Sequence, residues 1–180
     1  MARNEDDIIL VDRMDRVKGY APKLTAHQRG LRHRAISICI VNRDGRMLLQ
    51  KRAPEKYHSA GLWSNACCTH PRPAETVMEA AGRRLREELG VVCALTPSAR
   101  TAYRAPVGEG LIENEFVHLL TGIYDGAVNP DRKEVSDVAW CSQDEIVSGL
   151  ASEPHRYSYW FGHYVRTFGR SLFDAASGSQ

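Results

Sequence analysis

The chain has 180 residues, of which 43% are hydrophobic and 26% are charged, and its formal net charge is +2. A chain of this length fits one domain with a sizeable core, and so small a charge argues against binding nucleic acid or a membrane surface by bulk electrostatics. No stretch approaches the roughly 18 apolar residues that a membrane-spanning helix needs. We expect a single domain over residues 1–180, with residues 1–7 and 177–180 flexible.

The start of the chain and its cysteines indicate a cellular compartment. Residues 1–15 are rich in charge and contain no apolar segment of signal-peptide length. The cysteines are odd in number and form no Cys-x-x-Cys pair; they are Cys39, Cys67, Cys68, Cys93 and Cys141. This pattern is typical of reduced thiols rather than of a disulfide framework, and it predicts a cytoplasmic protein.

The first half of the chain predicts a hairpin followed by a helix. Ala35–Val41 and Met47–Gln50 are apolar enough for strands, and the Asp-Gly pair within residues 42–46 favours a tight turn between them. Thr76–Leu89 carries apolar residues at three- and four-residue spacing, which is typical of an amphipathic helix. Gly90 then suits the left-handed position just after a helix.

The second half predicts further strands and two helices. The expected strands are Val91–Leu95, Phe116–Tyr124 and Val135–Cys141. The expected helices are Gln143–Leu150, which follows a capping-box sequence, and His163–Ala176. Strands and helices mixed in this order predict an α/β or α+β domain.

A thiol and an imidazole lie close together in the segment before the first helix. Cys67 and Cys68 are adjacent, one residue separates Cys68 from His70, and a proline follows His70. Such a group could provide a nucleophile or a proton donor. The alternative is two small buried thiols and a loop histidine, which the pair alone favours.

Several charged or aromatic side chains could meet a phosphorylated substrate. Arg84 and Glu88 are four residues apart and share a helix face, either as a solvated ion pair or as a surface for a diphosphate and its magnesium. Arg52 and Lys56 could add fixed positive charge for phosphate oxygens. The aromatic segment 157–161 fits a core better than a cation-binding cage until a substrate is specified.

Two carboxylates open the strand expected around Phe116. If that strand begins early enough, its alternation places Glu113 and Glu115 on one face, where they repel unless a cation or a raised pKa intervenes. His27 and His33, just before the first strand, could add imidazoles for Zn²⁺ or Mn²⁺. The alternative is that these histidines are structural, as lone histidines usually are.

Taken together, four strings of residues resemble one family, type I isopentenyl-diphosphate isomerase, in its order and close to its spacing. The resemblance extends over about residues 8–172, and its strings are Leu31–Ala35, Trp63–Pro71, Arg84–Gly90 and Glu113–Glu115. The helix also resembles a Nudix box, but it has Thr69 where the pattern expects glycine and Arg84 where it expects a metal-binding glutamate. This second departure argues against diphosphate cleavage and for diphosphate binding, because a guanidinium grips phosphate oxygens.

The resemblance implies a Nudix-type mixed sheet sandwiched between helices, and it implies roles for individual residues. The catalytic residues would be Cys68, Glu115, Tyr103 and Trp160. The substrate diphosphate would be bound by Lys23, Arg52, Lys56 and Arg84. One divalent metal, Mn²⁺, Zn²⁺ or Mg²⁺, would be held by His27, His33, His70, Glu113 and Glu115. A magnesium ion shared with the diphosphate would be held by Glu88 and the backbone carbonyl of Cys68.

The reaction that the resemblance implies is the interconversion of isopentenyl and dimethylallyl diphosphate by protonation and deprotonation. Glu115 would protonate the terminal methylene, Trp160 would face the tertiary carbocation, and Cys68 would remove a proton from the neighbouring carbon as a thiolate. We expect a prenyl diphosphate as the only partner, with the chain a monomer or weak dimer. The rival hypotheses are a Nudix pyrophosphohydrolase and a non-catalytic module that binds metal or diphosphate.

Overall fold

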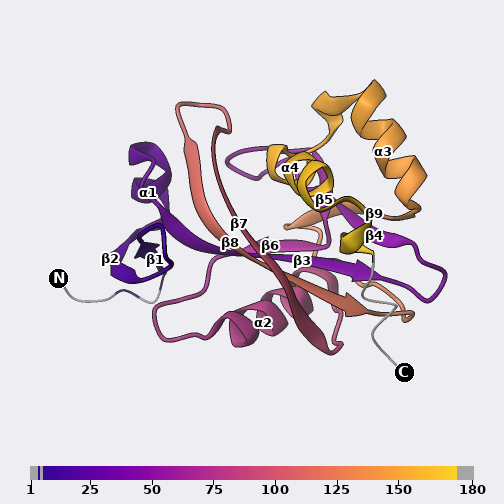
Figure 1. The fold of residues 1–180 in the computed structure, drawn as a ribbon, viewed down its shortest axis with the longest axis horizontal. Helices are drawn as coiled ribbons and strands as arrows, with labels where there is room; N and C mark the ends of the chain where they lie inside the picture. Colours follow the sequence, from indigo (N-terminus) through magenta and orange to yellow (C-terminus); the bar gives the residue numbers. More distant parts are fainter. Residues whose placement is uncertain (1–3, 5, 174–180) are drawn as a thin grey trace.

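A computed structural model describes residues 4 and 6–173, and Figure 1 shows their arrangement. The strands are β1 (Asp7–Val11), β2 (Val17–Pro22), β3 (His33–Val41), β4 (Met47–Arg52), β5 (Trp63–Asn65), β6 (Cys67–Thr69), β7 (Leu95–Pro106), β8 (Ile112–Ile123) and β9 (Val135–Cys141). The helices are α1 (Lys23–Arg29), α2 (Val77–Leu89), α3 (Gln143–Ser152) and α4 (Tyr159–Phe168), with 3₁₀ turns η1 (Pro154–Arg156) and η2 (Gly169–Leu172). Among these described residues, no helix is long and apolar enough to cross a bilayer.

The strands form a mixed sheet centred on β3. This strand runs parallel to β8 over the whole of residues 33–41 and antiparallel to the short β6. β7 continues the sheet beyond β8, while β4 pairs with β5 and β9. Strand β3 is buried along almost its entire length, which is typical of a central strand with both faces covered.

Each face of this sheet packs against helices, as predicted. Figure 1 shows α2 on one side of the sheet, with α3 and α4 on the other. One core cluster joins Leu85 and Leu89 of α2 to the sheet, and the other joins Phe161 and Tyr164 of α4 to the opposite face. The mixed sheet sandwiched between helices is therefore confirmed.

Local sequence signals explain the best-predicted elements. The turn after β3 contains Gly45 at φ +74°, a conformation that glycine adopts without strain. Helix α2 begins with a capping box between Thr76 and Glu79 and ends at Gly90 in the left-handed conformation. Ser142 caps α3 in the same way, as its sequence predicted, and α3 continues two residues beyond the expected end.

The bounds of several expected elements are wrong, and the strand expected at Phe116–Tyr124 already begins at Ile112. Residues 91–94 form no strand, because Val91 fills the core beneath α2 while the next strand, β7, begins only at Leu95. The last helix begins at Tyr159 rather than His163, because the side chain of Ser158 caps it. It ends at Phe168, and the rest of the expected helix to Ala176 lies partly outside the described residues.

The N-terminal elements β1, β2 and α1 were not predicted, and β1 already begins at Asp7. The turn between β1 and β2 is attached to the central strands through Asp15. Arg34 of β3 donates to Asp15 Oδ1 at 2.8 Å, and His118 of β8 lies 2.9 Å from Oδ2. These contacts hold the segment that carries Lys23 and His27 against the sheet.

Candidate active site

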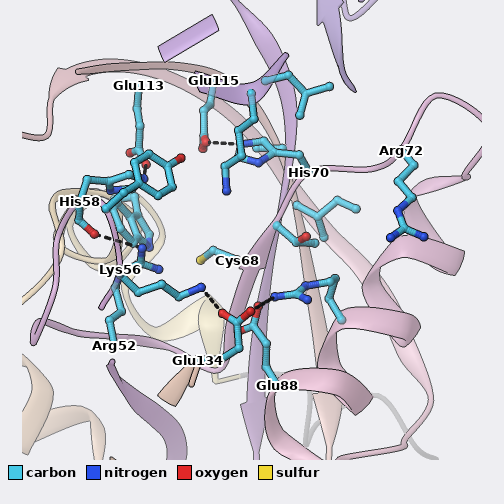
Figure 2. A pocket seen from close by; sticks show the side chains of 18 of the residues that line it. Arg52, Lys56, His58, Cys68, His70, Arg72, Glu88, Glu113, Glu115 and Glu134 are labelled. Atoms are coloured by element: carbon cyan, nitrogen blue, oxygen red, sulfur yellow. Dashed lines mark hydrogen bonds and ion pairs between the residues drawn. The ribbon is translucent and has the colours of Figure 1, made fainter. Parts of the chain in front are cut away.

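A cavity of about 290 Å³ opens between the N-terminal segment, the β4–β5 connection and the sheet. Its walls bring together residues from far apart in the chain. The predicted site residues that line it are Lys23, Arg52, Lys56, Cys68, His70, Arg84, Glu88, Tyr103, Glu113, Glu115 and Trp160. Figure 2 shows Cys68 in the middle, with Glu113 and Glu115 at one end and Glu88 and Glu134 at the other.

The first end of the cavity holds a buried group of imidazoles and carboxylates. His70 Nε2 lies 3.0 Å from Glu115 Oε1, and His33 Nε2 lies 3.5 Å from the same oxygen. Together with His27, these residues place one ligand atom each within 4.8 Å of all the others. We call this part of the cavity the histidine end; its members are His27, His33, His58, His70, Glu113 and Glu115.

The ring nitrogens of His27 and His33 show whether the histidine end is suited to a metal. His27 Nδ1 lies 2.7 Å from the carbonyl of Lys23, and His33 Nδ1 lies 2.8 Å from the carbonyl of Leu31. Those carbonyls keep the proton on Nδ1, and the Nε2 atoms of both rings are buried without a hydrogen-bond partner among the described residues. Metal-binding histidines are usually oriented in this way: one ring nitrogen donates its proton to a backbone carbonyl, and the lone pair of the other nitrogen is left for the metal.

Burial keeps the imidazoles of His27, His58 and His70 neutral. It lowers the pKa of His27 to about 4 and of His70 to about 3, although Glu115 acts in the opposite direction on both. Burial likewise lowers the pKa of His58 to about 3, helped by the charges of Arg52 and Lys23. A neutral imidazole is the form that binds a metal, so all three rings are ready to do so at neutral pH.

The two carboxylates of β8 lie on the same face, as alternation predicted, because β8 begins at Ile112. The hydroxyl of Tyr103 lies 2.8 Å from Oε2 of both Glu113 and Glu115. One hydroxyl proton serves only one acceptor at a time, so the pair needs a further proton or a cation. Burial and the charge of Glu115 raise the pKa of Glu113 to about 8, whereas the burial of Glu115 is outweighed by its contacts with His33 and His70, which keep its pKa low.

The two adjacent cysteines point to opposite faces of β6. Cys67 is fully buried in the core beneath α2, whereas Cys68 lines the cavity. The Cys68 sulfur lies 3.1 Å from Ser37 Oγ and 3.4 Å from Asn65 Oδ1. Burial raises the pKa of Cys68 to about 12, against the hydrogen bond from Ser37, so its resting form is the thiol.

The other end of the cavity pairs cations with acids. Arg84 Nη2 lies 2.5 Å from Glu88 Oε1 and 3.2 Å from Glu134 Oε1, and Lys56 forms a second ion pair with Glu134. The remaining oxygen of Glu88 accepts from Gln50 at 3.2 Å. We call this part the arginine end; its members are Lys56, Arg84, Glu88 and Glu134.

The other two predicted substrate-binding cations line the same cavity. Arg52 stacks 5.3 Å from the ring of Trp160, whose Nε1 donates to Ser64 Oγ at 2.8 Å. Lys23, at the start of α1, lies 5.2 Å from the ring of Tyr57. Burial and the neighbouring charges lower the pKa of Lys23 to about 8. Every predicted site residue therefore lies in the cavity or directly behind it.

Sequence reasoning missed several residues of this site, among them Glu134, Tyr57 and His58. Glu134 precedes β9 without any motif of its own, and only its contacts with Lys56 and Arg84 reveal it. Tyr57 and His58 follow Lys56 directly, and their nearness to a proposed phosphate-binding lysine was the one available signal. Such a signal is weak, because most loop histidines bind nothing.

Comparison with known proteins agrees with this geometry. Residues 31–161 match the NUDIX domain family. The chain is 49% identical over 158 residues to isopentenyl-diphosphate Delta-isomerase 2 of Aromatoleum aromaticum, covering 87% of this chain and 82% of that protein. It is 48% identical over 157 residues to isopentenyl-diphosphate Delta-isomerase of Burkholderia multivorans, covering 87% and 89%.

Solved structures support the fold. A crystal structure of a Deinococcus radiodurans protein superimposes with a TM-score of 0.74 and 17% sequence identity, covering 89% of this chain and 97% of that one. At this level of identity the likeness concerns the fold alone.

Proposed function

The chain belongs to the isopentenyl-diphosphate Delta-isomerase family and is built on a NUDIX domain, and from that membership we propose how its cavity interconverts isopentenyl and dimethylallyl diphosphate. The isomerase function rests on identities of 48–49% over most of the chain. One observation carries the assignment to this cavity: the thiol of Cys68 lies between a buried carboxylate cluster and a cluster of cations (Figure 2). This layout fits a short hydrocarbon with a diphosphate at one end.

The arginine end would bind the diphosphate. Arg84 and Lys56 offer cationic donors for phosphate oxygens, and Lys23 and Arg52 line the same cavity and add positive charge. In the described structure Arg84 and Lys56 are paired with Glu134, so a diphosphate would take over contacts that an acid now makes. Hydrogen bonds to charged groups contribute about 1.5–3 kcal/mol each, so this exchange favours a dianionic or more highly charged ligand.

The histidine end would hold a divalent metal through His27, His33, His70, Glu113 and Glu115. The ion, Mn²⁺, Zn²⁺ or Mg²⁺, would neutralise the two carboxylates and hold Glu115 in place. A magnesium ion bound together with the diphosphate would be held by Glu88 and the backbone carbonyl of Cys68, and it would neutralise the phosphate charge. Supporting the first site are the two unpartnered, buried Nε2 atoms of His27 and His33.

Proton transfer would use Glu115 and Cys68 as a pair. For isopentenyl diphosphate, the carboxyl of Glu115 would give its proton to the terminal methylene, which leaves a tertiary cation at C3, and the sulfur of Cys68 would take a proton from C2. The resting forms, a thiol on Cys68 and a carboxylate on Glu115, are those from which the reverse reaction starts, and the move of one proton from the thiol to the carboxylate would give the forms that start the forward reaction. The hydroxyl of Tyr103 bridges Glu113 and Glu115. Glu113 retains a proton because its pKa is raised, and the hydroxyl would pass that proton to Glu115.

Trp160 would stabilise the carbocation between the two transfers. Its ring is 3% exposed, and its orientation is fixed by the hydrogen bond to Ser64. A cation over a desolvated indole face is stabilised by about 2 kcal/mol. Burial also excludes water, which would otherwise capture the carbocation as an alcohol.

The cellular setting follows from the same reasoning. The chain would act on a small prenyl diphosphate, with no nucleic-acid or membrane partner, as a cytoplasmic monomer or weak dimer. All five cysteines are free in the structure, which supports a reducing compartment.

The experiment that tests this function separates isomerisation from hydrolysis. Metal-loaded protein is incubated with isopentenyl diphosphate, and ¹H and ³¹P NMR follow both the alkene and the phosphates. We expect dimethylallyl diphosphate to accumulate to equilibrium with no release of phosphate or pyrophosphate. Release of either without the isomer would show a hydrolase, and an unchanged substrate would show a binding module.

A further inference from the structure

His58 is a buried residue of the cavity that the roles described above do not use. It lies in the connection between β4 and β5, is 8% exposed, and follows the aromatic residue Tyr57. The next residue, Ser59, has φ +51°, a conformation that costs a non-glycine residue free energy. The carbonyl of His58 accepts from Arg52 Nη2 at 3.2 Å, which fastens this strained turn to the cavity wall.

The imidazole of His58 faces the histidine end. Its Nε2 lies 3.7 Å from Glu113 Oε1, and its ring stacks on that of His27 at 5.7 Å between centroids. Figure 2 shows His58 next to Glu113 on the cavity wall. Its other nitrogen, Nδ1, lies 3.2 Å from Ser59 Oγ. The ring is therefore oriented with Nε2 directed toward the carboxylate.

The distances suit a shared ion rather than a hydrogen bond. At 3.7 Å the contact between His58 and Glu113 is longer than an N–H···O hydrogen bond. Two donors that each lie about 2.1 Å from one metal ion can be up to about 4.2 Å apart. His27, His58 and Glu113 each place a ligand atom within 4.8 Å of the others, and all three are buried. His27 belongs to both groups of the histidine end, and its Nε2 atom has no hydrogen-bond partner among the described residues.

We propose that His58 is a direct ligand of a divalent metal ion at the histidine end, acting with His27 and Glu113. The family resemblance implies no role for this imidazole, and His27 links its group to the group of His33, His70 and Glu115. Imidazole ligands favour transition metals over Mg²⁺. This inference rests on the metal site of the proposed function and adds a ligand to it.

The test counts imidazoles in Co²⁺-loaded protein. A histidine that binds Co²⁺ through Nε2 gives a strongly shifted resonance from its Nδ1–H proton, which disappears in D₂O. We expect the wild-type protein to show one more such resonance than His58→Ala. We also expect the Kd for Co²⁺ to rise at least about tenfold in that variant, as the loss of a metal-site partner commonly causes. His155→Ala, which removes an exposed imidazole far along the chain, serves as the matched control and should match wild type in both measurements.

The results distinguish a His58 that binds the metal from a His58 that lies outside the coordination sphere. Equal numbers of shifted resonances in wild type and His58→Ala would overturn the proposal even if the affinity fell, because His58 would then lie outside the coordination sphere. Circular dichroism and the melting temperature of the metal-free proteins establish that the variant folds, and His58→Gln provides a second, larger side chain if His58→Ala does not. A wild-type protein without any shifted resonance would refute the metal site of the proposed function as well. The loss of one resonance in His58→Ala, with none lost in His155→Ala, would support both.

Discussion

The two ends of the cavity treat buried charge in opposite ways. At the arginine end, cations and acids are already paired: Arg84 contacts Glu88 and Glu134, and Lys56 contacts Glu134. At the histidine end, two carboxylates share one hydroxyl, that of Tyr103, and among the described residues the buried Nε2 atoms of His27 and His33 have no hydrogen-bond partner. Because an unpaired buried charge is costly, the second arrangement requires something that the chain itself does not supply.

The chain itself supplies the counter-charges at the arginine end, whereas a ligand must supply them at the histidine end. The arginine end is complete as a folded structure, and a diphosphate must compete with Glu134 for its cations. The histidine end is incomplete without a metal or an added proton. Cys68 lies between them, so that a substrate fixed at one end meets its proton donor at the other (Figure 2). Four experiments test whether the two ends differ in this way.

The largest effect should come from removing either member of the proton-transfer pair. We expect Cys68→Ala and Glu115→Gln each to lower kcat by about 10³-fold or more, because general acid–base groups contribute about 10²–10⁴-fold. Cys67→Ala is the matched control, since Cys67 points into the core beneath α2, and it should keep most of the activity. Initial rates of isomerisation measure all three. Wild-type turnover in either of the first two variants would refute the assigned roles.

Metal removal should affect the histidine end in both activity and stability. Dialysis against a chelator should abolish turnover and lower the melting temperature. A metal present at 100 times its Kd stabilises the folded state by about 2.7 kcal/mol. His33→Ala should melt at the same temperature with or without metal, because it removes a ligand. Calorimetry with and without Mn²⁺ tests this, and a wild-type melting temperature independent of metal would be evidence against the site.

Substitution at the arginine end should raise KM more than it lowers kcat. We expect Arg84→Gln to raise KM for isopentenyl diphosphate by about tenfold or more, since a hydrogen bond between charged groups contributes about 1.5–3 kcal/mol. Arg86→Gln, on the exposed side of the same helix, should leave KM unchanged. Steady-state kinetics distinguish the two. A loss confined to kcat would mean that Arg84 acts on the reacting carbons rather than on the diphosphate.

The smallest effect should be a gain in affinity from Glu134→Gln. This change removes the acid that competes with the diphosphate for Lys56 and Arg84, so we expect KM to fall by about two- to fivefold, the range of partly exposed ion pairs. Glu153→Gln, which breaks a surface pair with Arg156, provides the control. A higher KM in Glu134→Gln would show that Glu134 holds the cations in position instead of competing for them.

Sequence reasoning predicted the parts of this molecule that depend on local signals. Alternation along β8 places Glu113 and Glu115 on one face, and a capping sequence marks the start of α3. The three-residue strands β5 and β6 are too short to show any periodicity, and α1 has only seven residues. These elements depend on pairing and packing with distant parts of the chain.

The residues of the candidate site also fall into two groups, those that the sequence could identify and those that it could not. Residues within recognisable strings, such as Cys68 and Glu88, could be identified from the sequence. Glu134 and His58 could not, because their roles depend on which side chains the fold brings beside them. The thiol form of Cys68 is also a product of burial, which no spacing of residues reveals.

The most direct test of proton transfer in this cavity is isomerisation in D₂O. Metal-loaded protein converts isopentenyl diphosphate, and NMR locates deuterium in the product. Protonation by Glu115 and deprotonation by Cys68 predict dimethylallyl diphosphate with deuterium in a methyl group that was the terminal methylene. Dimethylallyl diphosphate formed at full rate without deuterium would contradict this mechanism, because the hydrogen would then have moved within the substrate rather than through the protein.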